Sequence, residues 1–115
     1  MSTAESKAAG LQYGGRRFSP IGNPASVGQY HQDGDLVWAE FSGPSVRAGR
    51  LVGRCRPDGV IEASYCYLTA DGEPVAGACV STPTVRDDGR IMLTEQWHRL
   101  DGTAGVSQIE ELLPG

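Results

Sequence analysis

The amino-acid sequence predicts an all-β protein, a single antiparallel meander of about eight short strands that closes or nearly closes into a small barrel. Three observations predict this fold. Asp-Gly, a strong hairpin signal, occurs five times along the 115 residues. The stretches between these turns are rich in Val, Ile, Tyr, Trp, Thr and Leu, which favour strands. Eight strands in a row leave two unpaired edges, and closing the sheet removes them.

The turn signals divide the chain into its expected elements. The five Asp-Gly pairs begin at positions 33, 58, 71, 88 and 101, and a Gly-Pro pair at 43 adds another turn. The expected strands are 16–22, 26–31, 36–42, 45–56, 60–69, 73–86, 90–99 and 103–112. Residues 11–115 would form one barrel domain, and residues 1–10 a flexible polar lead-in.

The spacing of the Asp-Gly pairs also predicts which side chains share a face. If each x-Asp-Gly is a three-residue loop with glycine at the bulge position, residue 56 pairs with 60, 69 with 73, 86 with 90, and 99 with 103. Paired residues lie on the same face of a sheet. One face then carries a mostly apolar set: Leu51, Gly53, Cys55, Ile61, Ala63, Tyr65, Tyr67, Gly77, Cys79, Ser81, Ile91, Leu93, Glu95, Trp97, Ser107 and Ile109. The other face carries Arg50, Arg54, Arg56, Glu62, Arg90, Gln96 and His98, with Cys66, Val80 and Met92 as apolar exceptions.

The same reasoning extends to the N-terminal half of the chain. We expect a three-residue loop at 32–34 and a two-residue loop at 43–44. The second loop would pair Glu40 with Arg47 and Trp38 with Gly49. The residues that this extension places inside are Tyr30, Leu36, Trp38, Glu40, Arg47 and Gly49.

The predicted interior is partly polar. An eight-stranded barrel has room either for its own side chains or for one small ligand. Glu95 falls opposite Ser81 on one side and Ser107 on the other, which makes it a candidate general acid or base. A satisfied polar network that fixes the strand register is the alternative interpretation. The candidate ligand-binding residues are Tyr30, Trp38, Glu40, Arg47, Tyr65, Tyr67, Ser81, Trp97 and Ser107.

Composition excludes several classes of function. The net charge is −4 and no basic stripe is present, so we expect no nucleic-acid partner. No apolar run approaches the roughly 18 residues of a spanning helix, so we expect no membrane insertion. The three cysteines form no C-x-x-C pair, which indicates reduced thiols, a cytoplasmic location and no metal site. We expect no cofactor.

From Tyr30 onward the chain resembles a family of small bacterial proteins. The motifs that carry the resemblance are Tyr30-His31-Gln32, Val37-Trp38-Ala39, Val46-Arg47, Gly49-x-Leu51-x-Gly53, Gly77-x-Cys79-Val80-Ser81-Thr82-Pro83, Asp88-Gly89-Arg90, Leu93-x-Glu95-x-Trp97 and Ser107-x-Ile109-Glu110-Glu111. Members of this family often carry the name N-acetylglutamate synthase, so the resemblance implies acetyl transfer. At the level of architecture, the predicted barrel also resembles the calycin-like barrels, which include lipid and retinoid carriers and small cyclases.

Three hypotheses about function remain open. The first is a small-molecule-binding barrel, either a carrier or a cofactor-free cyclase or isomerase of bacterial specialised metabolism, with an apolar or mixed-polarity ligand. The second is a non-catalytic homodimer that associates through an outer patch around Cys66, Val80 and Met92. The third is the acetyltransferase that the family name implies.

Overall fold

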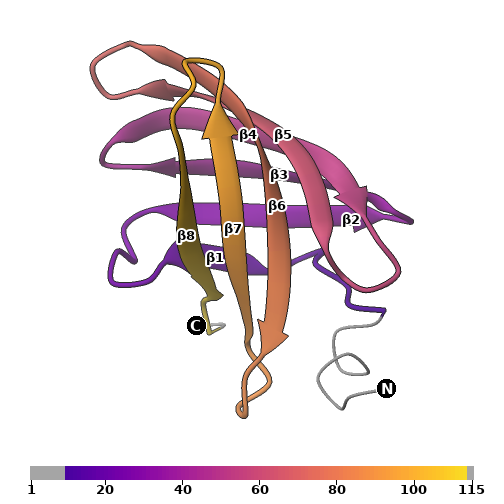
Figure 1. Cartoon of the computed structure of the whole chain (residues 1–115). Helices are drawn as coiled ribbons and strands as arrows, with labels where there is room; N and C mark the ends of the chain where they lie inside the picture. The colour runs from indigo at the N-terminus through magenta and orange to yellow at the C-terminus, as the bar shows by residue number, and fades with distance from the viewer. Residues whose placement is uncertain (1–9, 114–115) are drawn as a thin grey trace.

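The computed structural model describes residues 10–113, which form eight antiparallel strands closed into one barrel (Figure 1). The strands are β1 (Arg17–Pro20), β2 (Val27–Asp33), β3 (Leu36–Gly43), β4 (Val46–Cys55), β5 (Ile61–Thr69), β6 (Pro74–Val85), β7 (Ile91–Arg99) and β8 (Ala104–Glu111). Each strand pairs with its neighbours in the chain, and β1 pairs with β8 to close the sheet. The predicted all-β meander and its closure are therefore confirmed.

Two further sequence expectations concern the chain ends and membranes. The predicted lead-in at 1–10 lies outside the described residues, apart from Gly10. Over the part of the chain that the structure describes, no helix is long and apolar enough to cross a bilayer.

Four hairpins confirm the predicted three-residue loop. In the β4–β5 hairpin, the Arg56 N–H donates to the Val60 carbonyl at 2.8 Å, and the Gly59 N–H donates to the Arg56 carbonyl at 2.9 Å. The β5–β6, β6–β7 and β7–β8 hairpins repeat this pattern. The glycine of each loop has φ between 87° and 91°, a conformation that favours glycine. The predicted register of β4 to β8 follows from these loops and is confirmed.

The register of β2, β3 and β4 differs from the prediction. The β2–β3 loop has two residues, 34–35, so Tyr30 pairs with Ala39. Irregular pairing around the β3–β4 loop sets Trp38 opposite Val52, three residues beyond its predicted partner. An odd shift moves side chains to the other face of a sheet. The prediction that Leu36, Trp38 and Glu40 face inward is therefore wrong.

The tightly packed core lies at one end of the barrel. Its largest fully buried apolar side chains are Tyr13, Val37, Ile61, Ile91 and Leu93, together with Phe18 at the boundary of this core. Tyr13 precedes β1. Its hydroxyl donates to the carbonyl of Gly59, which lies in the β4–β5 loop, at 2.5 Å. The Tyr13 ring also packs against Phe18 and Tyr30, with ring centroids 6.5 and 6.4 Å apart. This end of the barrel is filled by the chain's own side chains, and we call it the closed end.

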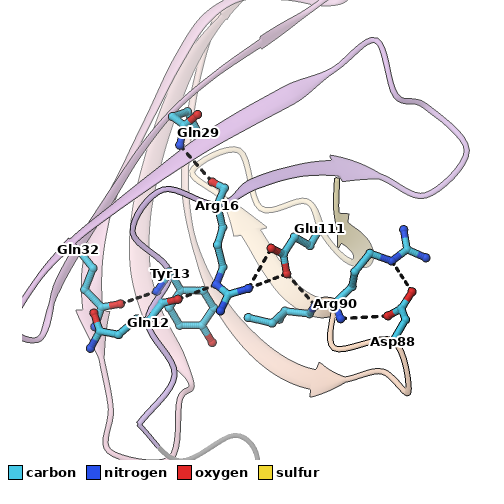
Figure 2. Close-up of polar contacts among 9 residues, drawn as sticks. Gln12, Tyr13, Arg16, Gln29, Gln32, Asp88, Arg90 and Glu111 are labelled. Atoms are coloured by element: carbon cyan, nitrogen blue, oxygen red, sulfur yellow. Dashed lines mark hydrogen bonds and ion pairs between the residues drawn. The ribbon is translucent and has the colours of Figure 1, made fainter. Parts of the chain in front are cut away.

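Polar contacts fasten the chain at the closed end, next to the β1–β8 seam (Figure 2). The Arg16 guanidinium donates to both carboxylate oxygens of Glu111 at 2.9 Å. Glu111 also accepts the backbone N–H of Ile91 at 3.1 Å. The Gln32 side chain accepts the Tyr13 N–H at 2.8 Å. Since β1 and β8 share only a short ladder, the Arg16–Glu111 pair reinforces the closure of the barrel.

Candidate functional site

The opposite end of the barrel, which we call the open end, holds a cavity of about 310 Å³. Its walls come from the parts of the strands that lead to the β1–β2, β3–β4, β5–β6 and β7–β8 turns. The lining side chains are mostly aromatic or aliphatic: Phe18, Pro20, Val27, Tyr30, Phe41, Val46, Leu51, Tyr65, Tyr67, Trp97 and Ile109. Polar residues in the lining include Ser26, Ser42, Glu95, Arg99 and Ser107. Because Ser42 and Ser107 are also exposed, the cavity communicates with solvent. Its volume is at the lower limit of small-ligand sites.

Glycines make room for the aromatic walls. A Cβ on Gly77 would come within 2.6 Å of the Tyr65 hydroxyl oxygen, and a Cβ on Gly105 within 2.5 Å of the Trp97 ring. Gly49 likewise lies against an aromatic ring of β3. The ring over Gly49 is that of Phe41, and the ring over Gly77 is that of Tyr65. The rings lie over these glycines and line the cavity.

Glu95 is the carboxyl group of the cavity. It pairs with Ser81 on β6 and with Ser107 on β8, as the turn spacing predicts. The Ser81 hydroxyl donates to Glu95 at 3.4 Å, which is a long hydrogen bond, whereas Ser107 accepts the indole N–H of Trp97 at 2.9 Å. Burial raises the pKa of Glu95 to about 7, against a smaller lowering by the Ser81 hydrogen bond. The carboxyl therefore changes charge near neutral pH.

The groups closest to Glu95 stay uncharged at neutral pH. Burial, reinforced by the nearby Glu95 carboxylate, raises the pKa of the Tyr30 hydroxyl well above its ordinary value. The same two causes, in the same order, raise the pKa of the Cys79 thiol to about 11. A thiol with so high a pKa is a poor nucleophile at neutral pH. The chemistry of the inner cavity therefore depends on Glu95.

Arg99 supplies a positive charge at the mouth of the cavity. Glu95, Trp97 and Arg99 alternate along β7 and all line the cavity, with Arg99 next to the β7–β8 turn. The Arg99 guanidinium carbon lies 4.7 Å from the centroid of the Trp97 ring. Its Nε is buried and has no hydrogen-bond partner among residues 10–113. The cavity thus has a carboxyl group inside, that of Glu95, and a guanidinium group at its rim, that of Arg99. Both groups have unused hydrogen-bonding capacity.

Most of the residues predicted for the site come together in the structure. Tyr30, Tyr65, Tyr67, Glu95, Trp97 and Ser107 line the cavity. Ser81 is buried behind Glu95. Their roles in binding or catalysis stay predictions.

Trp38, Glu40 and Arg47 do not reach the cavity. Trp38 stacks on His31 on the outer face of the sheet, with ring centroids 5.2 Å apart. Glu40 contacts the His31 Nε2 at 2.9 Å on the same face. Arg47 is exposed at the irregularity of β4 that follows Val46. The prediction that these three side chains line the interior is wrong, because their register rested on two misjudged loops.

Sequence reasoning missed Phe18, Phe41 and Arg99. The alternation of Val37, Ala39 and Phe41 is the signal that could have found Phe41, since period two marks one face of a strand. Arg99 follows an inward tryptophan by two residues, so the same rule applied one step further reaches it. Phe18 lies in the short first strand, and no turn signal in the sequence sets the register of that strand.

The closed sheet of eight antiparallel strands agrees with a calycin-like architecture. A family model described as avidin-like protein matches residues 11–112, and this family has a β-barrel fold. An avidin-like barrel suggests small-molecule binding as its general function.

Other comparisons add no closer relative. A search of the curated proteins found no match, and a search of the solved structures found none. The name N-acetylglutamate synthase is not supported by the family that matches. The extent of the family match and the closed barrel agree: this chain belongs to the avidin-like protein family.

Proposed function

We propose that this protein is a carrier that binds one small molecule of mixed polarity in the cavity at its open end. The observation that carries the proposal is the position of Glu95, a half-buried residue whose carboxyl group lies in an aromatic wall at the end of the barrel that its own side chains leave unfilled. A cavity with mostly apolar walls and a few convergent polar groups is typical of a small-molecule site.

The hydrogen bonding of Glu95 supports a bound ligand. A carboxylate can accept several hydrogen bonds, and Glu95 accepts one long bond, from Ser81. Leaving a buried polar group underbonded is costly. A ligand with an N–H or O–H donor would complete the bonding of Glu95 while its apolar part covers the aromatic walls. Such a ligand would bind reversibly, through apolar contacts and hydrogen bonds.

A pair of neighbouring variants tests this proposal. Ser107→Tyr puts a large side chain into the cavity lining, whereas Gln108→Tyr puts the same side chain on the outer face, where Gln108 contacts Thr94. We expect a metabolite library, screened by thermal unfolding, to yield ligands that stabilise the wild type and Gln108→Tyr but not Ser107→Tyr. A library without a single stabilising compound would contradict the proposal, as would equal stabilisation of both variants.

A cofactor-free cyclase or isomerase is the second candidate function. It is favoured by the pKa of Glu95, about 7, because a general acid or base works best when its pKa is near the operating pH. Incubation of the protein with each ligand found above, followed by mass spectrometry and NMR, would reveal a product. In the catalytic version, Glu95→Gln should abolish product formation and keep ligand binding. If no ligand is converted, the carrier function remains.

A homodimer is the third candidate and rests on the outer face. Val80 and Val106 flank Gln96 across β6, β7 and β8, and their exposed fractions are 38% and 66%. The patch predicted from the sequence is interrupted, because Met92 is half-buried and its sulfur lies 3.3 Å from the Arg86 guanidinium. Sedimentation over a range of concentrations tests the idea, and a strict monomer at high concentration would remove it.

Acetyl transfer gains no support from the structure. Common acetyl-CoA sites hold the pyrophosphate at the N-terminus of a helix. The described residues contain no helix. The cytoplasmic location expected from the unpaired cysteines stays a prediction, and all three thiols are free in the structure.

A further inference from the structure

Resting on the proposed binding function, we propose that the ligand is a small zwitterion whose two charges are separated by a short apolar or aromatic spacer. Its ammonium group pairs with Glu95 inside the cavity, and its anionic group meets Arg99 at the mouth.

The inner end of the cavity favours binding of a cation. Glu95 faces an apolar wall, and its one hydrogen-bond donor in the structure is the Ser81 hydroxyl at 3.4 Å. The neighbouring Tyr30 and Cys79 are neutral groups. A buried carboxylate without a counterion is unfavourable, and a cation brought by the ligand removes that penalty.

The walls suit a cation that is attached to an apolar body. Tyr65 and Tyr67 stack with their ring centroids 6.2 Å apart, and Trp97 and Tyr30 complete an aromatic lining around Glu95. Aromatic faces attract ammonium groups and also cover hydrocarbon. An alkyl or aryl amine therefore satisfies both the carboxylate and the rings.

The mouth of the cavity calls for an anion. Arg99 is the single cationic side chain in the lining contributed by residues 10–113. Its guanidinium is held over the Trp97 ring, and its buried Nε lacks a partner within the described chain. Guanidinium groups with unused donors bind carboxylates well.

The spacing of the two charges limits the class of ligand. Glu95 and Arg99 are four residues apart on β7, so their Cα atoms are about 13 Å apart at about 3.3 Å per residue. Because the two Cα atoms are this far apart, we expect an α-amino acid, which carries its ammonium and carboxylate on one carbon, to reach only one of the two groups. The geometry points to an amino acid of the ω type, in which a chain or ring separates the two charges.

A fluorescence titration with matched probes tests this assignment. Trp38→Phe leaves Trp97, in the cavity wall, as the sole tryptophan. The probes are 4-(2-aminoethyl)benzoic acid, 2-phenylethylamine, 4-ethylbenzoic acid and phenylalanine. At pH 8 we expect the first, a zwitterion with an aryl spacer, to bind at least tenfold more tightly than the other three.

Variants of the two charged residues separate their contributions. In the Trp38→Phe background, Glu95→Gln should weaken the two probes that carry an amine on a spacer and leave 4-ethylbenzoic acid unchanged. Arg99→Gln should weaken the two benzoic acids and leave 2-phenylethylamine unchanged. The thermal unfolding midpoint of each variant reports whether it folds.

The pH profile of the unsubstituted site keeps the test independent of those variants. Since the pKa of Glu95 is about 7, the zwitterion should bind about tenfold more weakly at pH 6 than at pH 8. The titratable and charged groups that line the cavity with Glu95 are Tyr30 of β2, Tyr65 and Tyr67 of β5, Cys79 of β6 and Arg99 of its own strand. The pKa values of Tyr30, Tyr65 and Cys79 are all raised, away from this interval. His31 and His98 lie on the outer face.

The outcomes distinguish the two proposals. Affinity that rises as the pH falls, or equal binding of charged and uncharged probes, would overturn the zwitterion assignment. If these probes fail while library compounds of another class bind the wild type and not Ser107→Tyr, the assignment is wrong and the carrier function stands. If the library also yields no ligand, both are wrong.

Discussion

The two ends of this barrel are built from the same strands and differ in what their side chains leave unsatisfied. Strand β7, which runs from one end of the barrel to the other (Figure 1), shows the change. Ile91 and Leu93 are fully buried at the closed end. Glu95, Trp97 and Arg99 line the cavity at the open end. At the closed end, polar groups are paired in the structure. At the open end, the Glu95 carboxyl group and the Arg99 guanidinium group have unused hydrogen-bonding capacity. The comparison indicates that the closed end supplies stability, and it supports the proposal that the open end binds a ligand.

The largest expected effect compares truncations at the two ends. Leu93→Ala removes a fully buried side chain from the closed end and should cost about 2–5 kcal/mol in the free energy of unfolding. Val46→Ala, in the half-buried cavity lining, should cost about 1 kcal/mol or less, because little packing surrounds it. Urea unfolding of both variants measures the difference. Equal costs would show that the ends are packed alike.

A second prediction concerns the charge of Glu95. Its folded-state pKa of about 7 is above its ordinary 4.5, so the folded protein holds this proton more tightly than the unfolded chain does. Stability is therefore lost as the pH rises from about 4.5 to about 7, and the loss is complete above that range. The stability of Glu95→Gln relative to the wild type should rise by about 2 kcal/mol between pH 5 and pH 8. Unfolding curves at both pH values test this, and a constant difference would argue that Glu95 is well solvated.

Two hairpin glycines give the third comparison. Gly72 at the open end and Gly59 at the closed end have φ of 89° and 87°, so alanine at either position is strained. A Cβ on Gly72 would meet nothing within 4 Å, so Gly72→Ala should cost only the backbone strain, about 1 kcal/mol. Gly59→Ala should cost more. A backbone shift that relieves the strain at position 59 would also move the carbonyl that accepts the Tyr13 hydroxyl. Thermal unfolding ranks the two variants, and an equal shift would mean that the Tyr13 contact adds little.

The smallest expected effect compares two ion pairs. At the closed end, one guanidinium nitrogen of Arg16 donates to both carboxylate oxygens of Glu111, and the side-chain exposures are 33% and 14%. Arg54 and Glu62 are 65% and 48% exposed on the outer face. Double-mutant cycles with Met and Gln should give a coupling of about 1 kcal/mol for the first pair and close to zero for the second. A larger coupling for the exposed pair would contradict the role given to Arg16 and Glu111 in closing the barrel.

The sequence predicted the half of the barrel in which turn chemistry is regular. From β4 to β8, each x-Asp-Gly turn has the same loop length, so one rule placed Glu95 between Ser81 and Ser107 and turned Tyr65 and Trp97 inward. This register depends on local backbone geometry. A glycine at positive φ is typical of the three-residue hairpin loop, so the sequence predicts the loop length and with it the register. The polar part of the site could be predicted for that reason.

The other half could not be predicted by the same rule. The β2–β3 loop consists of Gly34 and Asp35, so Asp33 is the last residue of β2 and lies outside the loop. The strands on both sides of the β3–β4 turn also contain irregular pairs, which their residue types do not predict. For this reason the prediction that Trp38 and Glu40 face inward is wrong. The existence of the cavity also depends on how large rings settle over small residues, and this packing is a tertiary property that a register rule cannot supply.

The central claim is that Glu95 lies in a largely apolar cavity at the open end of a barrel whose other end is filled. An NMR titration of the Glu95 side-chain carboxyl carbon tests it most directly. The account predicts a midpoint of about 7. A midpoint near the ordinary 4.5 would place Glu95 in water and contradict the binding site proposed here.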